Sequence, residues 1–133
     1  GHAKDYVKMQ WLMLQQDIPE DFVIASGHQY SVRDFVEKSG SVLDMNIKWI
    51  GQGLKEIGYL NNKPIIKIDP RYFRATEVDT LLGDASKAKN KLGWEPKISF
   101  EKLVEEMTLA DLRSAEESEL INKHGFKVKN YFE

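Results

Sequence analysis

The spacing of apolar and polar residues predicts two helices in the first third of the chain. Residues Lys4 to Gln16 carry a broad apolar face at helical spacing. A second helix is expected to begin after Ser31, because Asp34 stands three residues on and forms a near capping box. Its apolar face continues to Leu43, although Gly40 inside it weakens the helical pattern.

Two further helices are predicted in the last third of the chain. A short helix is expected from Ser86 to Leu92, closed by Gly93, which suits the residue after a helix C-terminus. A long helix is expected to open at Ser99 and to run to about Leu120. Between them, Trp94 is predicted to be a core anchor packed under this last helix.

Three short apolar runs are predicted to be strands: Phe22 to Ala25, Ile47 to Ile50 and Ile65 to Ile68. The residues from Gly51 to Lys63 include three glycines and two asparagines and are predicted to form a loop. Helices mixed with short strands, without regular βαβ alternation, predict the α/β class: one small layered domain covering residues 1–133.

Composition excludes several classes of function. The net charge of −2 argues against general affinity for nucleic acid. The chain has no cysteine, which excludes disulfides and thiolate metal sites, and its three histidines are isolated from one another. Without an apolar run of membrane-spanning length or a signal peptide, the expected location is the cytoplasm.

An arginine and a carboxylate follow the third predicted strand. Arg74 and Glu77 are three residues apart, and Asp69-Pro70 is expected to end the strand before them because proline lacks a ladder donor. A guanidinium suits a pyrophosphate, and a carboxylate accepts hydrogen bonds from sugar hydroxyls. The pair predicts a nucleotide-sugar clamp; the alternative is a surface ion pair between Arg74 and Glu77 or Asp79.

Neighbouring residues are given structural roles. Tyr72 and Phe73 are predicted to be buried and to hold the turn, so that Arg74 projects on the same side as Glu77. Arg71 is assigned to the surface and Arg33 to solvent. Asp84 and Lys87 are also interpreted as structural.

Several motifs resemble the GDP-mannose 4,6-dehydratase family of extended short-chain dehydrogenases/reductases. They are Asp-Pro-Arg-Tyr-Phe-Arg from Asp69, Glu77-Val78, Leu-Leu-Gly-Asp from Leu81, and Leu-Gly-Trp-Glu-Pro from Leu92, with good matches also from Gly1 to Val7 and from Tyr30 to Val36. Ala75 departs from the family, which usually has proline there. The Leu-Gly-Trp-x-Pro motif is shared widely among nucleotide-sugar epimerases and dehydratases, whereas Phe-Arg-x-x-Glu-Val is more specific.

The resemblance implies that this chain is the C-terminal substrate-binding lobe of such an enzyme, without the Rossmann lobe. The parent would be an NADP-dependent lyase of GDP-fucose biosynthesis that converts GDP-mannose to GDP-4-keto-6-deoxymannose, and it would be a homo-oligomer. Arg74 would bind the pyrophosphate and Glu77 the ribose hydroxyls. Catalytic residues and NADP would belong to the missing N-terminal lobe, so the chain alone is expected to be inactive.

Two motifs are rejected as cofactor or catalytic signals. Gly51-Gln52-Gly53 is not followed at the right distance by Gly58, and no helical pattern begins there, so no dinucleotide-binding turn is predicted. Tyr59 and Lys63 have the spacing of the family's catalytic pair, but Asn61-Asn62 favours a turn instead of the helix which that pair needs.

The sequence leaves two other functions open. One is the lobe of a related GDP-sugar epimerase or reductase. The other is a non-catalytic binding domain that pairs with a protein through an exposed apolar face. On any of these readings, we expect the chain to be a monomer or to associate through apolar surface near Tyr6, Phe22 or Tyr30.

Overall fold

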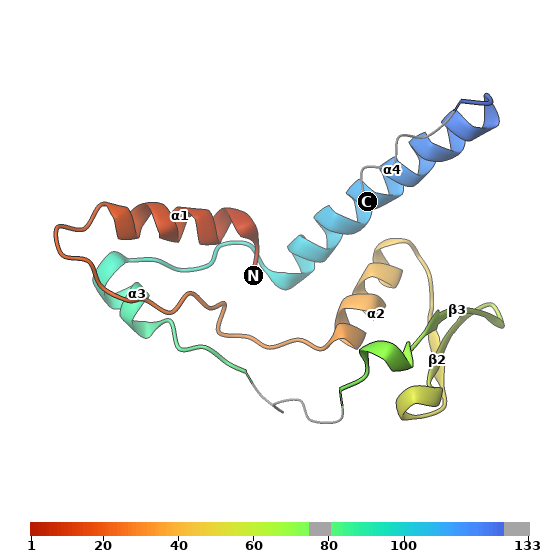
Figure 1. Ribbon diagram of the computed structural model, residues 1–133, viewed down its shortest axis with the longest axis horizontal. Helices are drawn as coiled ribbons and strands as arrows, with labels where there is room; N and C mark the ends of the chain where they lie inside the picture. The colour runs from red at the N-terminus through yellow and green to blue at the C-terminus, as the bar shows by residue number, and fades with distance from the viewer. Residues whose placement is uncertain (75–80, 127–133) are drawn as a thin grey trace.

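The computed structural model describes residues 1–74 and 81–126. The chain forms an elongated molecule in which α1 and α3 lie at one end and α2 and the sheet at the other, while α4 extends away from both (Figure 1). The helices within the described residues are α1 (Ala3–Leu14), α2 (Val32–Val42), α3 (Ser86–Leu92) and α4 (Phe100–Lys123), with 3-10 helices η1 (Gly53–Lys55) and η2 (Pro70–Tyr72).

Local capping explains where the helices begin and end. Ser31 and Asp34 form the predicted capping box, since each side chain accepts a hydrogen bond from the other's backbone N–H. The Ser99 hydroxyl accepts from the Lys102 N–H at the start of α4, and Gly93 closes α3 with φ of 62°. The four predicted helices are thus confirmed within a few residues.

The strands form one antiparallel sheet in the order β1 (Lys48–Ile50), β2 (Ile57–Leu60) and β3 (Lys63–Lys67). The predicted loop from Gly51 to Lys63 is therefore wrong, because β2 lies inside it. Asn61 and Asn62, with φ of 49° and 64°, form a two-residue turn between β2 and β3. Two left-handed residues match the twist of a tight hairpin, and asparagine tolerates this conformation.

The strand predicted for Phe22 to Ala25 is also wrong. This segment does not form a strand, although Phe22 and Ile24 pack against the core and Val23 is exposed, the alternation typical of a strand. A Cβ on Gly83 would lie 2.8 Å from the Cβ of Ala25, so residues near Gly83 run beside the segment. Within the described residues no backbone hydrogen-bond ladder joins the two, and an extended segment without a ladder is not a strand.

A small core lies between α1 and α3. It contains the buried side chains of Met9, Ala88 and Trp94, with Phe22 and Ile24 packed against it. Trp94 is 2% exposed and is a core anchor as predicted. Its partners, however, are α1 and α3 and not α4, because its indole Nε1 donates to the Asp5 carbonyl at 2.9 Å.

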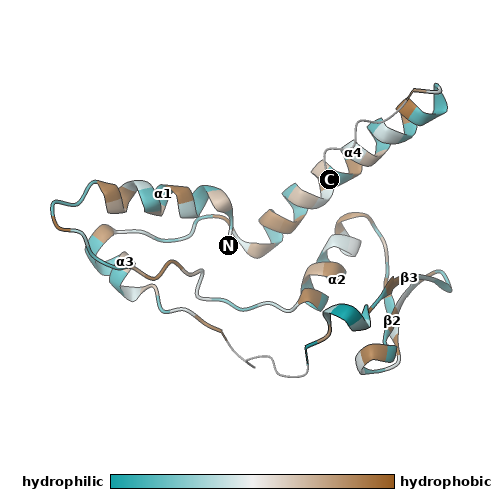
Figure 2. Cartoon of the chain, viewed as in Figure 1, coloured by the Kyte–Doolittle hydropathy of each residue, from teal (hydrophilic) through white to brown (hydrophobic). Residues whose placement is uncertain are grey.

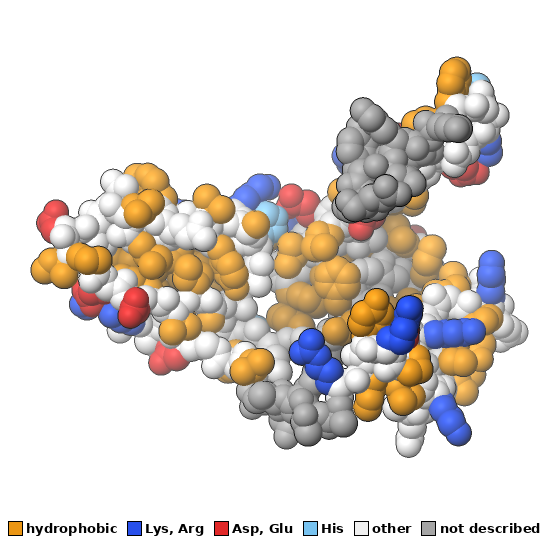
Figure 3. Space-filling view, in the orientation of Figure 1, with side chains coloured by type: hydrophobic (Ala, Val, Ile, Leu, Met, Phe, Trp, Pro, Cys, Tyr) orange, Lys and Arg blue, Asp and Glu red, His pale blue; other side chains and the backbone are white. Residues whose placement is uncertain are grey.

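Much apolar surface stays exposed on α1. Hydrophobic residues recur along the helix (Figure 2), and Val7, Trp11 and Leu14 are between 58% and 82% exposed. Ile18, just beyond the helix, is 72% exposed. We call these four residues the α1 stripe. Orange hydrophobic side chains also gather over this end of the molecule in the space-filling view (Figure 3). Tyr6 and Phe22 pack against the core, so the most exposed apolar residues here are those of the stripe.

Within the described residues, no helix is both long enough and apolar enough to cross a membrane.

Candidate functional site

The segment that carries Arg74 leaves the sheet at the end of β3. Asp69 caps η2 by accepting a hydrogen bond from the Arg71 N–H at 3.0 Å, and Pro70 begins the 3-10 helix, so the predicted end of the strand is confirmed. The chain then passes through Phe73, which has extended backbone, and reaches Arg74. The end of β3 and the short helix η2 therefore determine where Arg74 lies.

Arg71 is engaged on the surface, as predicted. Its Nη2 donates to Asp69 Oδ2 at 2.6 Å, and its guanidinium lies 5.5 Å from the centroid of the Tyr72 ring. This hydrogen bond lowers the pKa of the Asp69 carboxyl and raises the pKa of Arg71. Arg71 is therefore folded back on its own segment, whereas Arg74 is exposed.

The prediction that Tyr72 and Phe73 are buried is wrong. Tyr72 is 77% exposed and Phe73 is 52% exposed. The turn does not need them in the core, because Asp69 and Pro70 hold it through the cap and the fixed proline φ. Glu77 lies outside the described residues, so the arrangement of Arg74 relative to Glu77 stays a prediction.

Arg33 is not the solvated charge that the sequence suggested. Its guanidinium pairs with the Glu56 carboxylate, and its Cζ lies 4.4 Å from the centroid of the Trp49 ring. The hydrogen bond to Glu56 raises the pKa of Arg33. Lys87 is structural, as predicted: its Nζ donates to the Asp21 carbonyl at 2.8 Å and lies 4.8 Å from the Phe22 ring centroid.

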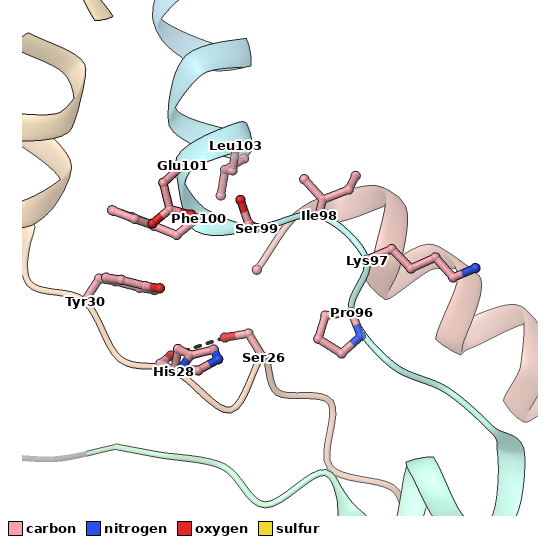
Figure 4. Close-up of a pocket in the computed structure, with 11 residues that line it drawn as sticks. Ser26, His28, Tyr30, Pro96, Lys97, Ile98, Ser99, Phe100, Glu101 and Leu103 are labelled. Carbon is pink, nitrogen blue, oxygen red and sulfur yellow. Dashed lines mark hydrogen bonds between the residues drawn. The ribbon is translucent and has the colours of Figure 1, made fainter. Parts of the chain in front are cut away.

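A separate hollow of about 600 Å³ lies between the loop near Ser26 and the segment that leads into α4 (Figure 4). On its walls, Tyr30 stacks on Phe100 with centroids 3.9 Å apart, and Phe100 also meets the edge of Phe35. Sequence reasoning missed this cluster. The sequence does carry a signal for it, a hydrophobic staple: an apolar residue before the helix N-cap packs on one four positions after the N-cap. Here Tyr30 precedes the N-cap Ser31, and Phe35 is four positions after it.

The described residues that line the hollow do not form a catalytic arrangement. The Ser26 hydroxyl donates to the His28 carbonyl at 3.2 Å, and the Ser99 hydroxyl accepts from Lys102 N–H, so both hydroxyls hold local structure. Arg74 does not line it. Its volume suits a ligand or a packed chain segment, and it is distinct from the Arg74 segment.

The described residues do not present a cofactor or metal centre. The turn predicted at Asn61-Asn62 is confirmed, so Tyr59 and Lys63 lie on either side of the β2–β3 turn and not on one helix. In Gly51-Gln52-Gly53, Gln52 is the N-cap and Gly53 the first residue of the three-residue η1, which is too short to cradle a pyrophosphate. Among residues 1–74 and 81–126, no cluster of three or more histidines and carboxylates could hold a metal ion.

Two motifs that carry the family resemblance meet in the fold. The buried Asp5 carboxylate accepts hydrogen bonds from the N–H groups of Lys97 and Ile98 at 3.0 and 2.9 Å, and its carbonyl accepts from Trp94. The N-terminal motif thus holds the segment that follows Leu-Gly-Trp-Glu-Pro. Asp5 and Trp94 therefore have structural roles.

Comparison with known proteins gives consistent results. The family model "GDP-mannose 4,6 dehydratase" matches residues 1–107. The chain is 50% identical over 140 residues to a GDP-mannose 4,6-dehydratase of Vibrio cholerae, covering 96% of this chain and 38% of that protein. It is 55% identical over 114 residues to the Dictyostelium discoideum protein of that name (84% and 32% covered) and 52% identical over 114 residues to the Homo sapiens one (84% and 31% covered). The chain therefore spans about a third of the length of these curated relatives.

Proposed function

The chain belongs to the GDP-mannose 4,6-dehydratase family, and we propose that it is the substrate-binding lobe of such an enzyme. The parent enzyme converts GDP-mannose to GDP-4-keto-6-deoxymannose, an NADP-dependent lyase reaction that supplies GDP-fucose biosynthesis in the cytoplasm. The observation that carries the proposal is the family match over residues 1–107, which includes the Arg74 segment. A related GDP-sugar epimerase or reductase is a weaker fit, since the three relatives compared above are named as dehydratases.

Arg74 binds the pyrophosphate of GDP-mannose in this proposal. Two features support it: Arg74 is exposed, and the neighbouring Arg71 is already engaged by Asp69. A guanidinium can place two parallel N–H donors on phosphate oxygens, which fixes orientation as well as affinity. Glu77 accepts from the ribose hydroxyls, and together they hold the hexose in position for chemistry.

The chemistry itself is assigned to the rest of the parent protein. The described residues do not fit NADP, because they lack a glycine-rich turn at the junction of a strand and a helix. They also lack the tyrosine–lysine pair of the family on one helix. We therefore propose that the N-terminal Rossmann lobe binds NADP and supplies the catalytic groups, and that this chain alone does not turn over GDP-mannose.

The α1 stripe supports the proposal that another lobe of the parent protein packs on this chain. A helix that is packed on one face and apolar on the other is typical of an element that lies between two layers. α1 packs on Trp94 through Met9, while Val7, Trp11 and Leu14 remain exposed. We propose that the N-terminal lobe of the parent covers the stripe, and that the parent assembles as a homo-oligomer.

Kinetics of the complete parent enzyme test the clamp. Arg74→Ala removes a charge-assisted contact of about 1.5–3 kcal/mol, so the KM for GDP-mannose should rise roughly ten- to a hundredfold. Glu77→Gln should cost less, because one acceptor oxygen remains. If Arg74→Ala leaves both KM and kcat unchanged, the clamp is wrong and Arg74 is a surface residue.

A further inference from the structure

We propose that Arg33 is a positioning residue for the nucleotide-sugar site: it fixes the end of the sheet from which the chain continues to Arg74. Arg33 does not touch the substrate in this proposal and acts through Arg74. The inference rests on the proposed function. It adds a residue that is distant from Arg74 in sequence and supports the position of Arg74.

The first observation is that α2 holds the sheet at two polar points. From the first turn of α2, the Arg33 guanidinium pairs with Glu56 and covers the Trp49 ring at 4.4 Å. One turn on, Glu37 accepts a hydrogen bond from the Trp49 indole Nε1 at 2.9 Å. Trp49 belongs to β1 and Glu56 immediately precedes β2, so α2 is tied to β1 and to the residue at which the chain enters β2.

The second observation is the register of the sheet. Glu56 is followed by Ile57, which pairs with Ile50 of β1 on one side and with Lys67 of β3 on the other. Lys67 is the last residue of β3. Arg33 therefore holds the sheet next to the row formed by Ile50, Ile57 and Lys67. From Lys67 the chain continues to η2 and Arg74.

The third observation is the chemistry of the contact. The Glu56 side chain is 17% exposed and the Arg33 side chain 40% exposed. An ordinary exposed ion pair orders little, but a planar guanidinium that is paired at its edge and stacked on its face is fixed in two directions. Lysine can keep the charge and cannot keep both contacts, so Arg33→Lys is the informative variant.

Position matters at the clamp because a bidentate contact depends on angle and distance. Loosening the last row of the sheet would widen the range of positions sampled by Arg74. The predicted consequence is weaker binding of GDP-mannose, with the chemical step left intact.

A double-mutant cycle in the complete parent enzyme tests this. Arg33→Lys and Arg74→Ala are made singly and together, and KM and kcat for GDP-mannose are measured for each. Arg33→Lys should raise KM about five- to tenfold with kcat within about twofold, and should add little in the Arg74→Ala background. Glu56→Gln, which keeps an acceptor but loses the charge, should raise KM by a smaller factor.

Lys91→Ala is the matched control. It removes another surface ion pair, between Lys91 and Glu20 at 2.7 Å, which lies at the α3 end of the molecule. Its KM should be unchanged. Thermal unfolding of every variant shows whether a change in KM follows a loss of folded protein.

Three outcomes overturn the inference, and they can be told apart. If Arg33→Lys raises KM equally with and without Arg74, then Arg33 acts through the general fold. If Arg74→Ala raises KM but Arg33→Lys does not, the positioning role is wrong and the proposed function stands. If Arg74→Ala has no effect while Arg33→Lys does, both the clamp and the positioning role are wrong.

Discussion

The α1–α3 region and the α2–sheet region are held together by different means. Around α1 and α3, Met9, Ala88 and Trp94 are fully or almost fully buried. Around α2, Trp49 is only half buried and is held by Arg33 and by a hydrogen bond. The first region thus depends on a small apolar core, and the second depends more on polar and stacked contacts.

The two regions also differ in what they leave uncovered. The α1 stripe exposes four large apolar side chains, which a soluble surface rarely gathers without a partner. The α2–sheet region carries the Arg74 segment at its margin. We interpret the first region as a joint to the rest of the parent protein and the second as the substrate-facing part.

The largest expected effect is on stability and distinguishes Trp94 from Trp49. Trp94→Ala deletes a buried ring and its hydrogen bond to Asp5, so the free energy of unfolding should fall by about 3–5 kcal/mol. Trp49→Ala removes a half-buried ring and should cost clearly less. Urea denaturation of the chain measures both, and equal losses would contradict the contrast between the regions.

A smaller effect is expected at Gly40 in α2. Alanine favours helices by about 1 kcal/mol over glycine, but a Cβ here would lie 2.9 Å from the Met45 carbonyl oxygen. We therefore expect Gly40→Ala to destabilise the chain by about 1–3 kcal/mol. The neighbouring Ser39→Ala is the control: its buried hydroxyl has no hydrogen-bond partner among the residues that the structure describes, so denaturation should show no loss of stability. A stabilised Gly40→Ala would show that the helix end can move.

A still smaller effect on stability, but a clear effect on association, is expected from the α1 stripe. Trp11→Ser with Leu14→Ser should change the free energy of unfolding by about 0.5 kcal/mol or less, because both side chains are exposed. In the parent enzyme the same pair should weaken the joint between the lobes. Limited proteolysis would detect this as faster cleavage between them, and unchanged cleavage would count against the joint.

The smallest effects concern pH. Hydrogen bonds from Lys91 and then Lys87 lower the pKa of Glu20, and hydrogen bonds from the Ser31 hydroxyl and then its N–H lower the pKa of Asp34. A carboxyl whose pKa is lowered on folding stabilises the fold above its unfolded pKa and loses this contribution as pH falls through the folded value. The unfolded values are near 4.5 for glutamate and 3.8 for aspartate.

Stability should therefore fall slightly below about pH 4.5 and further below about pH 3.8. Glu20→Gln should flatten the first part of the fall and Asp34→Asn the second. Urea midpoints measured between pH 7 and pH 3 check this, and a midpoint that rises on acidification in the wild-type chain would contradict it.

The helices could be predicted from sequence because their signals are local. Ser31 with Asp34, Ser99, and Gly93 each fix a helix end through contacts a few residues away. β2 was missed because glycines and asparagines suggested a loop, although Asn61-Asn62 between two apolar runs is itself a hairpin signal. The position of the two asparagines between the apolar runs, and not the number of glycines and asparagines, indicates the hairpin.

The remaining differences come from contacts distant in sequence. The sequence predicts the wrong helix as the partner of Trp94, because its hydrogen bond to Asp5 joins residues far apart in the chain. The sequence predicts a solvated Arg33 because its partners, Trp49 in β1 and Glu56 just before β2, lie further along the chain. Of the predicted site, the structure gives the exposed position of Arg74 and the end of the strand before it, while Glu77 lies outside the described residues.

The most direct test of the central claim is calorimetric binding of GDP to the complete parent enzyme. Arg74→Ala is compared with Arg71→Ala, an arginine of the same segment that is already paired with Asp69. The account predicts that the Kd for GDP rises roughly ten- to a hundredfold in Arg74→Ala and stays near the wild-type value in Arg71→Ala. Equal affinities for Arg74→Ala and the wild type, or a larger loss in Arg71→Ala, would contradict it.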